Sequence, residues 1–166
     1  MNPTADVTIR PARTADVPAL GALGAALMRA HYAFDSRRFL APGDHPEAGY
    51  AAFLEAQLQN PEACVFVAEQ REGAAARIVG YVFAAVEPLS WKELRDRAGY
   101  IHDILIIEEA RGTGLGTRLL EAAITWLRGH DVPRVLLWTA AANTRARALF
   151  EAEGFRPTMV EMTREL

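Results

Sequence analysis

The segment Arg111-Gly112-Thr113-Gly114-Leu115-Gly116 has residue types and spacing that could bind a reactive ligand. It follows a predicted strand and opens a predicted amphipathic helix. Glycines allow the backbone to approach a ligand closely, and a helix N-terminus offers unpaired amides with a partial positive charge. Three glycines and an arginine exceed what a tight strand-to-helix turn requires. The segment therefore predicts a site for a phosphate or a pyrophosphate.

Two common nucleotide motifs fit this segment poorly. A P-loop ends in Gly-Lys-Ser/Thr, and the segment contains no lysine. A dinucleotide fingerprint needs a glycine three residues after Gly114, where the chain has Thr117. The preceding strand also lies within an antiparallel meander and does not start a βαβ unit. The phosphate ligand is therefore expected to be of another kind.

Length and charge limit the class of protein. The 166 residues fit one domain, residues 1–166, and 51% of them are hydrophobic, which argues against disorder. The formal net charge is −3, and no dense cluster of Lys and Arg occurs. Because nucleic-acid binding needs a basic excess or patch, we expect no nucleic-acid partner.

Cys64 is the one cysteine, so an intrachain disulfide and a multi-cysteine metal site are excluded. It lies in an apolar run and is predicted to be a buried structural thiol. We expect no bound metal. The sequence shows no signal peptide and no apolar run of about 20 residues, so we expect a cytoplasmic protein without membrane contact.

The elements that must position the glycine-rich segment follow from hydrophobic spacing. A first strand at 7–10 precedes a helix that starts near Thr14 to Asp16, with Pro18 in its first turn. A mixed loop at 31–46 leads to a helix at 46–59. Three antiparallel strands are predicted next, at 64–70, 78–86 and 100–107.

The C-terminal part continues with a helix after the glycines, a strand at 133–139 buried on both faces, and a short helix from Thr144 to Glu153. Phe155 onward is expected to supply one or two last strands. The order β-α-α-β-β-β-α-β-α-β predicts an α/β (α+β) fold. We expect a mixed, mostly antiparallel sheet of six or seven strands, flanked by about four helices.

Several motifs resemble those of the GNAT superfamily of N-acetyltransferases. Arg111, Gly114 and Gly116 match its pyrophosphate loop R/Q-x-x-G-x-G/A. The chain also resembles the family, in the correct order, in its opening strand and helix start, in the strand before the loop, and in the fourth-helix signature N-x-x-A-x-x-L-Y-E-x-x-G-F. The residues concerned are Ile9-Arg10-Pro11-Ala12 with Asp16, Asp103-Ile104-Leu105-Ile106, and Asn143, Ala146, Leu149, Phe150, Glu151, Gly154 and Phe155. Around the third of the antiparallel strands, the resemblance is to spermidine/spermine-type acetyltransferases.

This resemblance implies acetyl-CoA as co-substrate, bound where two parallel strands, 100–107 and 133–139, splay apart. Backbone groups of the first strand would bind the pantetheine arm, and the amides of the loop would bind the pyrophosphate. Asn143 carries over as a contact to the arm or to an ordered water. The implied cofactor-binding residues are Ile104, Leu105, Ile106, Arg111, Gly112, Thr113, Gly114, Leu115, Gly116, Thr117, Asn143 and Ala146.

The implied reaction is direct attack of a primary amine on the thioester, and it needs a group that accepts a proton. Polyamine-type relatives have Glu-Asp where this chain has His102-Asp103. His102 is a candidate base because histidine titrates near neutral pH; a histidine satisfied within the sheet is the alternative. Asp103 is a candidate for binding the acceptor ammonium; a structural carboxylate is the alternative.

One position departs from the family pattern, because Phe150 stands where a tyrosine usually protonates the departing thiolate. Phenylalanine has no proton to donate. The thiolate could leave unassisted, or water or another tyrosine could serve, with Tyr32, Tyr81 and Tyr100 as candidates. The departure also keeps open a non-catalytic acetyl-CoA-binding regulatory module.

The acceptor is expected to be a small-molecule amine bound by the segments 31–46 and 87–97. Protein N-terminal or lysine acetylation remains an alternative. The resemblance also implies a homodimer, in which the run Met159-Val160-Glu161-Met162-Thr163 could pair across a sheet edge.

Overall fold

Five strands form one mixed sheet in the computed structural model, which describes residues 6–166. The first five residues of the domain expected over 1–166 lie outside this range. The sheet order follows the chain, and neighbours are antiparallel except for the parallel pair β4 and β5. The strands are β1 (Asp6–Pro11), β2 (Ala63–Glu72), β3 (Ala75–Glu87), β4 (Ala98–Ile106) and β5 (Val135–Leu137).

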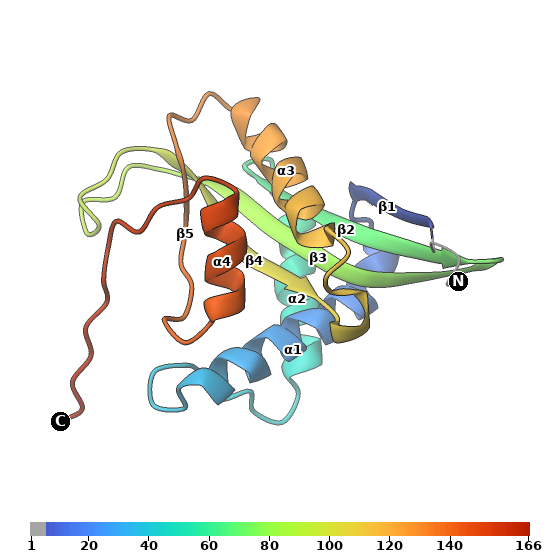
Figure 1. The fold of residues 1–166 in the computed structure, drawn as a ribbon, viewed down its shortest axis with the longest axis horizontal. Helices are drawn as coiled ribbons and strands as arrows, with labels where there is room; N and C mark the ends of the chain where they lie inside the picture. Colours follow the sequence, from blue (N-terminus) through green and yellow to red (C-terminus); the bar gives the residue numbers. More distant parts are fainter. Residues whose placement is uncertain (1–5) are drawn as a thin grey trace.

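Helices cover both faces of the sheet (Figure 1). Helices α1 (Val17–Phe34) and α2 (Pro46–Leu58) pack on one face, and α3 (Leu115–Arg128) and α4 (Thr144–Ala152) pack on the other. Two 3₁₀ turns, η1 (Thr14–Asp16) and η2 (Glu108–Ala110), precede α1 and the glycine-rich segment. The predicted α+β architecture, the antiparallel meander and the four helices are confirmed.

Each layer has its own apolar core because side chains alternate across a strand. On β3, Tyr81 and Phe83 face α1 and α2, whereas Val82 and Ala84 face α3. Helix α3 buries Leu119, Leu120, Ala123 and Leu127 completely, as their helical spacing predicts. Cys64 lies in the α3 core, and burial raises the pKa of its thiol to about 12, which confirms a structural thiol.

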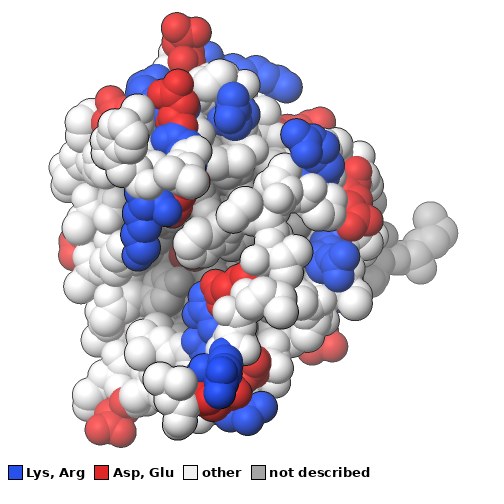
Figure 2. Space-filling view, turned by 90° about the vertical axis from the view of Figure 1, so that its left-hand side faces the viewer, with Lys and Arg blue, Asp and Glu red and all other residues white. Residues whose placement is uncertain are grey.

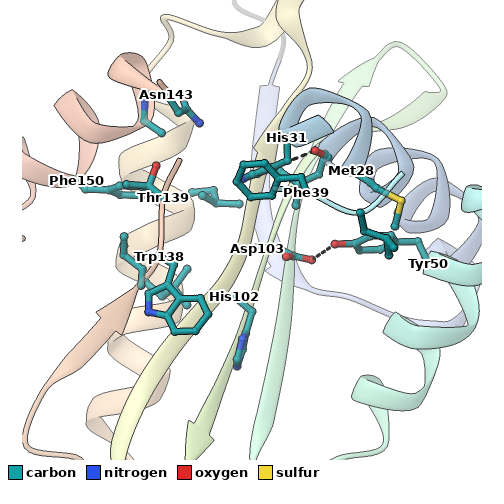
Figure 3. Close-up of a pocket in the computed structure, with 16 residues that line it drawn as sticks. Met28, His31, Phe39, Tyr50, His102, Asp103, Trp138, Thr139, Asn143 and Phe150 are labelled. Atoms are coloured by element: carbon teal, nitrogen blue, oxygen red, sulfur yellow. Dashed lines mark hydrogen bonds between the residues drawn. The ribbon is translucent and has the colours of Figure 1, made fainter. Parts of the chain in front are cut away.

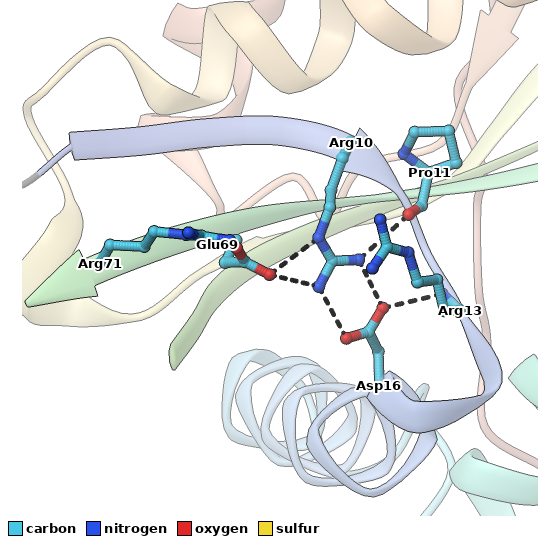
Figure 4. Close-up of polar contacts among 6 residues, drawn as sticks. All are labelled: Arg10, Pro11, Arg13, Asp16, Glu69 and Arg71. Carbon is cyan, nitrogen blue, oxygen red and sulfur yellow. Dashed lines mark hydrogen bonds and ion pairs between the residues drawn. The ribbon is translucent and has the colours of Figure 1, made fainter. Parts of the chain in front are cut away.

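Arg10 ties β1 to the start of α1 and to β2 (Figure 4). Its guanidinium donates to both carboxylate oxygens of Asp16, at 2.7 and 2.9 Å, and to Glu69 Oε2 at 2.6 and 2.8 Å. Asp16 also accepts from the Arg13 amide at 2.8 Å. The Asp16 carboxylate makes no cap bond to α1, and instead fixes the position of α1 against the sheet.

The parallel strands separate shortly after they meet. Pairing of β4 with β5 ends at Ile101 and Leu137, yet β4 continues to Ile106. A β-bulge adds to this irregularity. Phe83 of β3 pairs with Asp103 and the next residue, Ala84, pairs with Ile101, so His102 has no partner on β3. The predicted splayed strand pair is therefore present.

Three expectations about the C-terminal part are wrong. Residues 6–166 contain five strands, not six or seven, because 155–166 pairs with no strand. This tail instead makes ion pairs, Arg38 with Glu161 and Arg37 with Glu165. The strand expected at 133–139 is short and only half-buried, and Trp138 after it is 69% exposed, because β5 is the last strand of the sheet.

None of the helices within residues 6–166 has both the length and the apolar composition needed to cross a membrane.

Candidate active site

A cavity of about 260 Å³ opens where β4 and β5 part (Figure 3). Its floor is the stretch of β4 from Ile101 to Ile104. The remaining lining residues form two walls. The α1–α2 wall consists of Leu27, Met28, His31, Phe39, Leu40 and Tyr50. The β5–α4 wall consists of Leu137, Trp138, Thr139, Asn143, Ala146 and Phe150.

Asp103 is the one acidic residue in this lining. Its Oδ2 accepts hydrogen bonds from the hydroxyls of Tyr50, at 3.1 Å, and Tyr81, at 3.0 Å. Burial raises the pKa of the Asp103 carboxyl, and the two tyrosine bonds oppose that shift. Burial and the neighbouring carboxylate raise the pKa of both tyrosines, which therefore stay neutral donors. The carboxylate is held in place without a charged partner.

His102 lies beside Asp103 in a constrained position. Its ring stacks between those of Phe83 and Tyr100, with both pairs of centroids 4.9 Å apart. Its Nε2 lies 2.9 Å from Oε1 of Glu87. A carboxylate in this place can orient the imidazole ring. The residue has features of both a satisfied sheet histidine and a supported base.

His31 is a second histidine in the cavity lining, on the α1–α2 wall. Its Nδ1 lies 2.9 Å from the Leu27 carbonyl oxygen, one turn earlier in α1. Because a carbonyl can only accept, Nδ1 carries the hydrogen and Nε2 is the acceptor nitrogen of the neutral ring. The sequence indicates His31 only as part of the acceptor-binding segment 31–46, and its tautomer follows from helix geometry.

The glycine-rich loop lies beyond the cavity, at the start of α3. Gly112 and Gly114 have φ angles of 76° and 79°, and a Cβ at either would have no atom within 4 Å. No side chain caps the N-terminus of α3. Left-handed glycines in open space before uncapped helix amides form a cradle that suits a phosphate. Arg111 donates from Nε to the Ile106 carbonyl oxygen at 2.9 Å, which links the loop to β4.

Gly116 lies against α4. A Cβ there would lie 2.8 Å from Cδ2 of Leu149, so the glycine lets α4 pack closely against α3. Asn143 also has a structural role, because its Oδ1 accepts from the Ala146 amide at 3.2 Å and caps α4. Gly116 and Asn143 thus both help to position α4, which forms part of the β5–α4 wall.

The predicted site residues fall into two groups in space. The cavity lining brings together His102, Asp103, Ile104, Asn143 and Ala146. The rest of the predicted set lies outside it, at the end of β4 and along the loop into α3. That second group is Leu105, Ile106, Arg111, Gly112, Thr113, Gly114, Leu115, Gly116 and Thr117.

The acceptor-binding segments are placed only in part. From 31–46 the cavity takes His31, Phe39 and Leu40, whereas no residue of 87–97 lines it. Tyr50 could not be predicted from the sequence, because a tyrosine in the middle of a helix belongs to no motif. The hydrogen bond to Asp103 depends on how α2 packs on the sheet.

Phe150 lines the cavity and is 6% exposed. The three tyrosines considered as substitute acids do not reach the cavity. Tyr81 is fully buried and bonded to Asp103, while Tyr32 and Tyr100 are absent from the lining. Tyr50 is the one tyrosine there, and its hydroxyl is also engaged by Asp103.

Charges of both signs are mixed on the face shown in Figure 2, where neither blue nor red side chains form a continuous field. This pattern offers no basic track for a polyanion.

Comparison with known proteins identifies the class. Residues 27–155 match the family model for the acetyltransferase (GNAT) family, which covers more than half of the chain. The splayed strands, the glycine-rich loop and this match together show that the chain belongs to the GNAT acetyltransferases.

Curated relatives include an uncharacterized N-acetyltransferase, YhfO, of Bacillus subtilis. It is 28% identical over 149 residues, which are 90% of this chain and 89% of that protein. A mycothiol acetyltransferase of Thermobispora bispora is 31% identical over 135 residues, 78% of this chain. This match spans only 43% of that enzyme's length. The match to the mycothiol acetyltransferase of Jonesia denitrificans spans 24% of that enzyme's length.

Solved structures share the fold. A mutant of the BH1408 protein of Bacillus halodurans superimposes with a TM-score of 0.78 at 24% identity, covering 96% of this chain and 99% of that one. Aminoglycoside N-acetyltransferase AAC(6')-Iy in complex with CoA superimposes with a TM-score of 0.75 at 17% identity, covering 100% and 98%. At such identities the likeness concerns the fold alone.

Proposed function

We propose that the protein is an acetyl-CoA-dependent N-acetyltransferase that acetylates the primary amine of a small molecule. One observation carries the proposal: the cavity lies where β4 leaves β5, and the end of β4 leads from the cavity floor through η2 to the glycine cradle at the start of α3. A thioester at one end of an extended cofactor and a pyrophosphate at the other would need these two sites at once.

The residues present fit this cofactor. The open space above Gly112 and Gly114 would accept the pyrophosphate, and the amides of 112–117 would bind it. The β4 edge that β5 leaves free, at Ile104, Leu105 and Ile106, would bind the amides of the pantetheine arm. When bound, acetyl-CoA supplies an activated acyl group. The chain supplies orientation of the two reactants.

The reaction requires a neutral amine. The nitrogen releases one proton to water as it forms a bond to the acetyl carbonyl carbon and the carbon–sulfur bond breaks. Before that step, the bound ammonium must give up a proton to become the neutral amine. We assign His102 as the base that takes this proton, with Glu87 holding Nε2. Asp103 would bind the incoming ammonium. His31 is the competing base, since its Nε2 is free of protein partners within residues 6–166.

The departing thiolate has no tyrosine in the cavity with a free hydroxyl to protonate it. We propose that water supplies this proton, because thiols have a pKa near about 8.5 and leave readily. The same feature, Phe150, favours a second candidate function, a regulatory module that binds acetyl-CoA without turnover.

Coenzyme release over a panel of amines separates the two functions. Release above the rate of hydrolysis with any amine supports the enzyme. A rise in melting temperature with acetyl-CoA, and no amine-dependent release, supports the binding module. Acetylation of a peptide N-terminus or lysine, but of no small amine, would favour a protein substrate. No shift in melting temperature at millimolar acetyl-CoA would exclude both functions.

We also propose a homodimer. Its support is the C-terminal tail, where Met159, Val160 and Met162 are 79–86% exposed on a segment that pairs with no described strand. Light scattering at micromolar concentrations tests it, and a monomer there would contradict it.

A further inference from the structure

The charges that line the cavity define what it can accept. Its lining contains no Lys or Arg and a single carboxylate, Asp103. The arginines nearest in sequence to the α1–α2 wall are paired with surface acids, Arg29 with Glu47 and Arg38 with Glu161. The site therefore presents one negative charge and no positive charge from the side chains of Lys or Arg.

The Asp103 carboxylate is arranged to receive one further donor. Both tyrosine hydroxyls bond to Oδ2, and Oδ1 has no hydrogen-bond partner within residues 6–166. The same range has no fully buried side-chain oxygen without a partner, so Oδ1 retains access to the cavity. Neutral tyrosines leave the carboxylate charge uncompensated. A ligand cation at Oδ1 would provide the positively charged hydrogen-bond donor that no Lys or Arg provides.

The wall facing this carboxylate is apolar. Leu27, Met28, Phe39 and Leu40 contribute hydrocarbon surface, and the His31 ring packs edge-on against Phe39 with centroids 5.0 Å apart. Figure 3 shows Met28, Phe39 and Tyr50 on this side of β4, opposite Trp138, Thr139 and Phe150. A second charged group on the acceptor would find no Lys, Arg or second carboxylate on this wall, where the polar atoms are His31 Nε2 and the Tyr50 hydroxyl already bonded to Asp103.

We propose that the acceptor is a primary monoamine with an apolar alkyl or aromatic body and no acidic group. This rests on the proposed function and narrows it. The ammonium binds Oδ1 of Asp103, and the body lies against the α1–α2 wall. An α-amino acid is disfavoured because its carboxylate finds no Lys or Arg side chain in the lining. A diamine or polyamine is excluded because its second ammonium finds no second carboxylate.

Two matched pairs of amines test the proposal on the unaltered protein. Phenethylamine and phenylalanine share a body and differ in the carboxylate. Hexylamine and 1,6-diaminohexane share a chain and differ in the second ammonium. We expect kcat/KM to be at least about tenfold higher for the monoamine of each pair, since unpaired charges are rejected strongly by apolar sites. Equal or higher kcat/KM for either charged member would overturn the proposal while leaving the enzyme assignment intact.

Calorimetry with the same four amines, with and without saturating coenzyme A, gives a readout that needs no turnover. We expect tighter binding of the two monoamines, and weaker binding by at least about tenfold in Asp103→Asn. Asp44→Asn is the control, because Asp44 is an exposed carboxylate in the α1–α2 connection that does not line the cavity. This variant should bind the monoamines as the parent does. Absence of monoamine binding, or equal binding by Asp103→Asn, would overturn the proposal. Binding without acetyl transfer would instead contradict the proposed function.

Discussion

The two ends of the candidate site are built in different ways. The loop that precedes α3 acts through its backbone, with left-handed glycines and uncapped amides in open space. The α1–α2 wall acts through side chains, brought from two helices and one strand around Asp103. A backbone site suits the cofactor, which is the same for every acceptor amine. A site made of side chains can be altered by substitution to suit a different acceptor. Variants at the two ends should therefore separate cofactor binding from acceptor use.

The largest effect on cofactor binding is expected from Gly114→Asp at the backbone end. The new carboxylate would lie at the N-terminus of α3, where a phosphate is expected, and repel it. We expect the Kd for acetyl-CoA to rise by about 100-fold or more, measured by calorimetry. Gly73→Asp is the matched control, because Gly73 also has a left-handed φ, 63°, and open space, but lies in the β2–β3 turn. Equal losses in both variants would mean that backbone strain, not phosphate binding, is responsible.

His102→Ala should have the largest effect on turnover. We expect kcat/KM to fall by roughly 10²–10⁴-fold if the histidine takes the proton, with the Kd for acetyl-CoA nearly unchanged. His31→Ala provides the comparison within the cavity. A larger loss in His31→Ala, with a parental pH profile in His102→Ala, would transfer the role of base to His31.

Arg10→Met should act on the side-chain end through α1. The variant leaves Asp16 and Glu69 without their shared partner, and we expect the Tm at pH 7 to fall by roughly 5 °C. Because Arg10 anchors α1, KM for the amine should rise more than the Kd for acetyl-CoA. Arg71→Met is the control, since Arg71 touches Glu69 from an exposed position.

The same cluster gives this loss a pH dependence. Hydrogen bonds from Arg10 lower the pKa of both carboxyls. Carboxyls with a lowered pKa in the folded state stabilise it above their unfolded pKa of about 4, and lose this effect as pH falls through the folded value. The difference in Tm between Arg10→Met and the parent should therefore be full at pH 7 and shrink below about pH 4. A constant difference down to pH 2 would contradict this account.

Asp103→Asn should raise the Tm slightly at pH 7. Burial raises the pKa of this carboxyl, so its ionised form disfavours the folded state above the unfolded pKa. Protonation removes that penalty, and the gain in Tm should therefore diminish toward pH 4 and below. Thermal melts at pH 4 and pH 7 measure it, and a lower Tm for the variant at pH 7 would show that the charge stabilises the free protein.

Phe150→Tyr should have the smallest effect. A hydroxyl restored near the sulfur should raise kcat by at most about tenfold, because a thiolate leaves readily without an acid. The Kd for acetyl-CoA should stay within about twofold of the parent. Unchanged kcat would show that amine attack or product release limits turnover.

The backbone end could be predicted from the sequence because its determinants are contiguous. Glycines at fixed spacing between a strand and a helix specify local geometry, and Gly112 and Gly114 have the left-handed conformation that such a loop requires. The meander and α3 were predictable for a similar reason, since periodicity within each segment determines which side chains are buried.

The side-chain end could not be predicted in full, because its contacts join residues that are distant in sequence. Tyr50 and Tyr81 meet Asp103 only after α2 and β3 have packed around β4. The Arg10 cluster likewise spans β1, η1 and β2. The strands expected after Phe155 are absent from the described residues for a similar reason. Ion pairs with Arg37 and Arg38 of the α1–α2 connection hold this tail in place of a neighbouring strand.

The early end of β4–β5 pairing has a consequence for handling the free protein. From His102 to Ile106, the edge of β4 that β5 leaves carries backbone donors and acceptors that no strand satisfies. Such an edge is a template for pairing with other chains. A cofactor arm lying along it would occupy the place of a missing strand and close the sheet. Cells that supply abundant acetyl-CoA would then keep this protein from aggregating, and purification without the cofactor should favour its self-association.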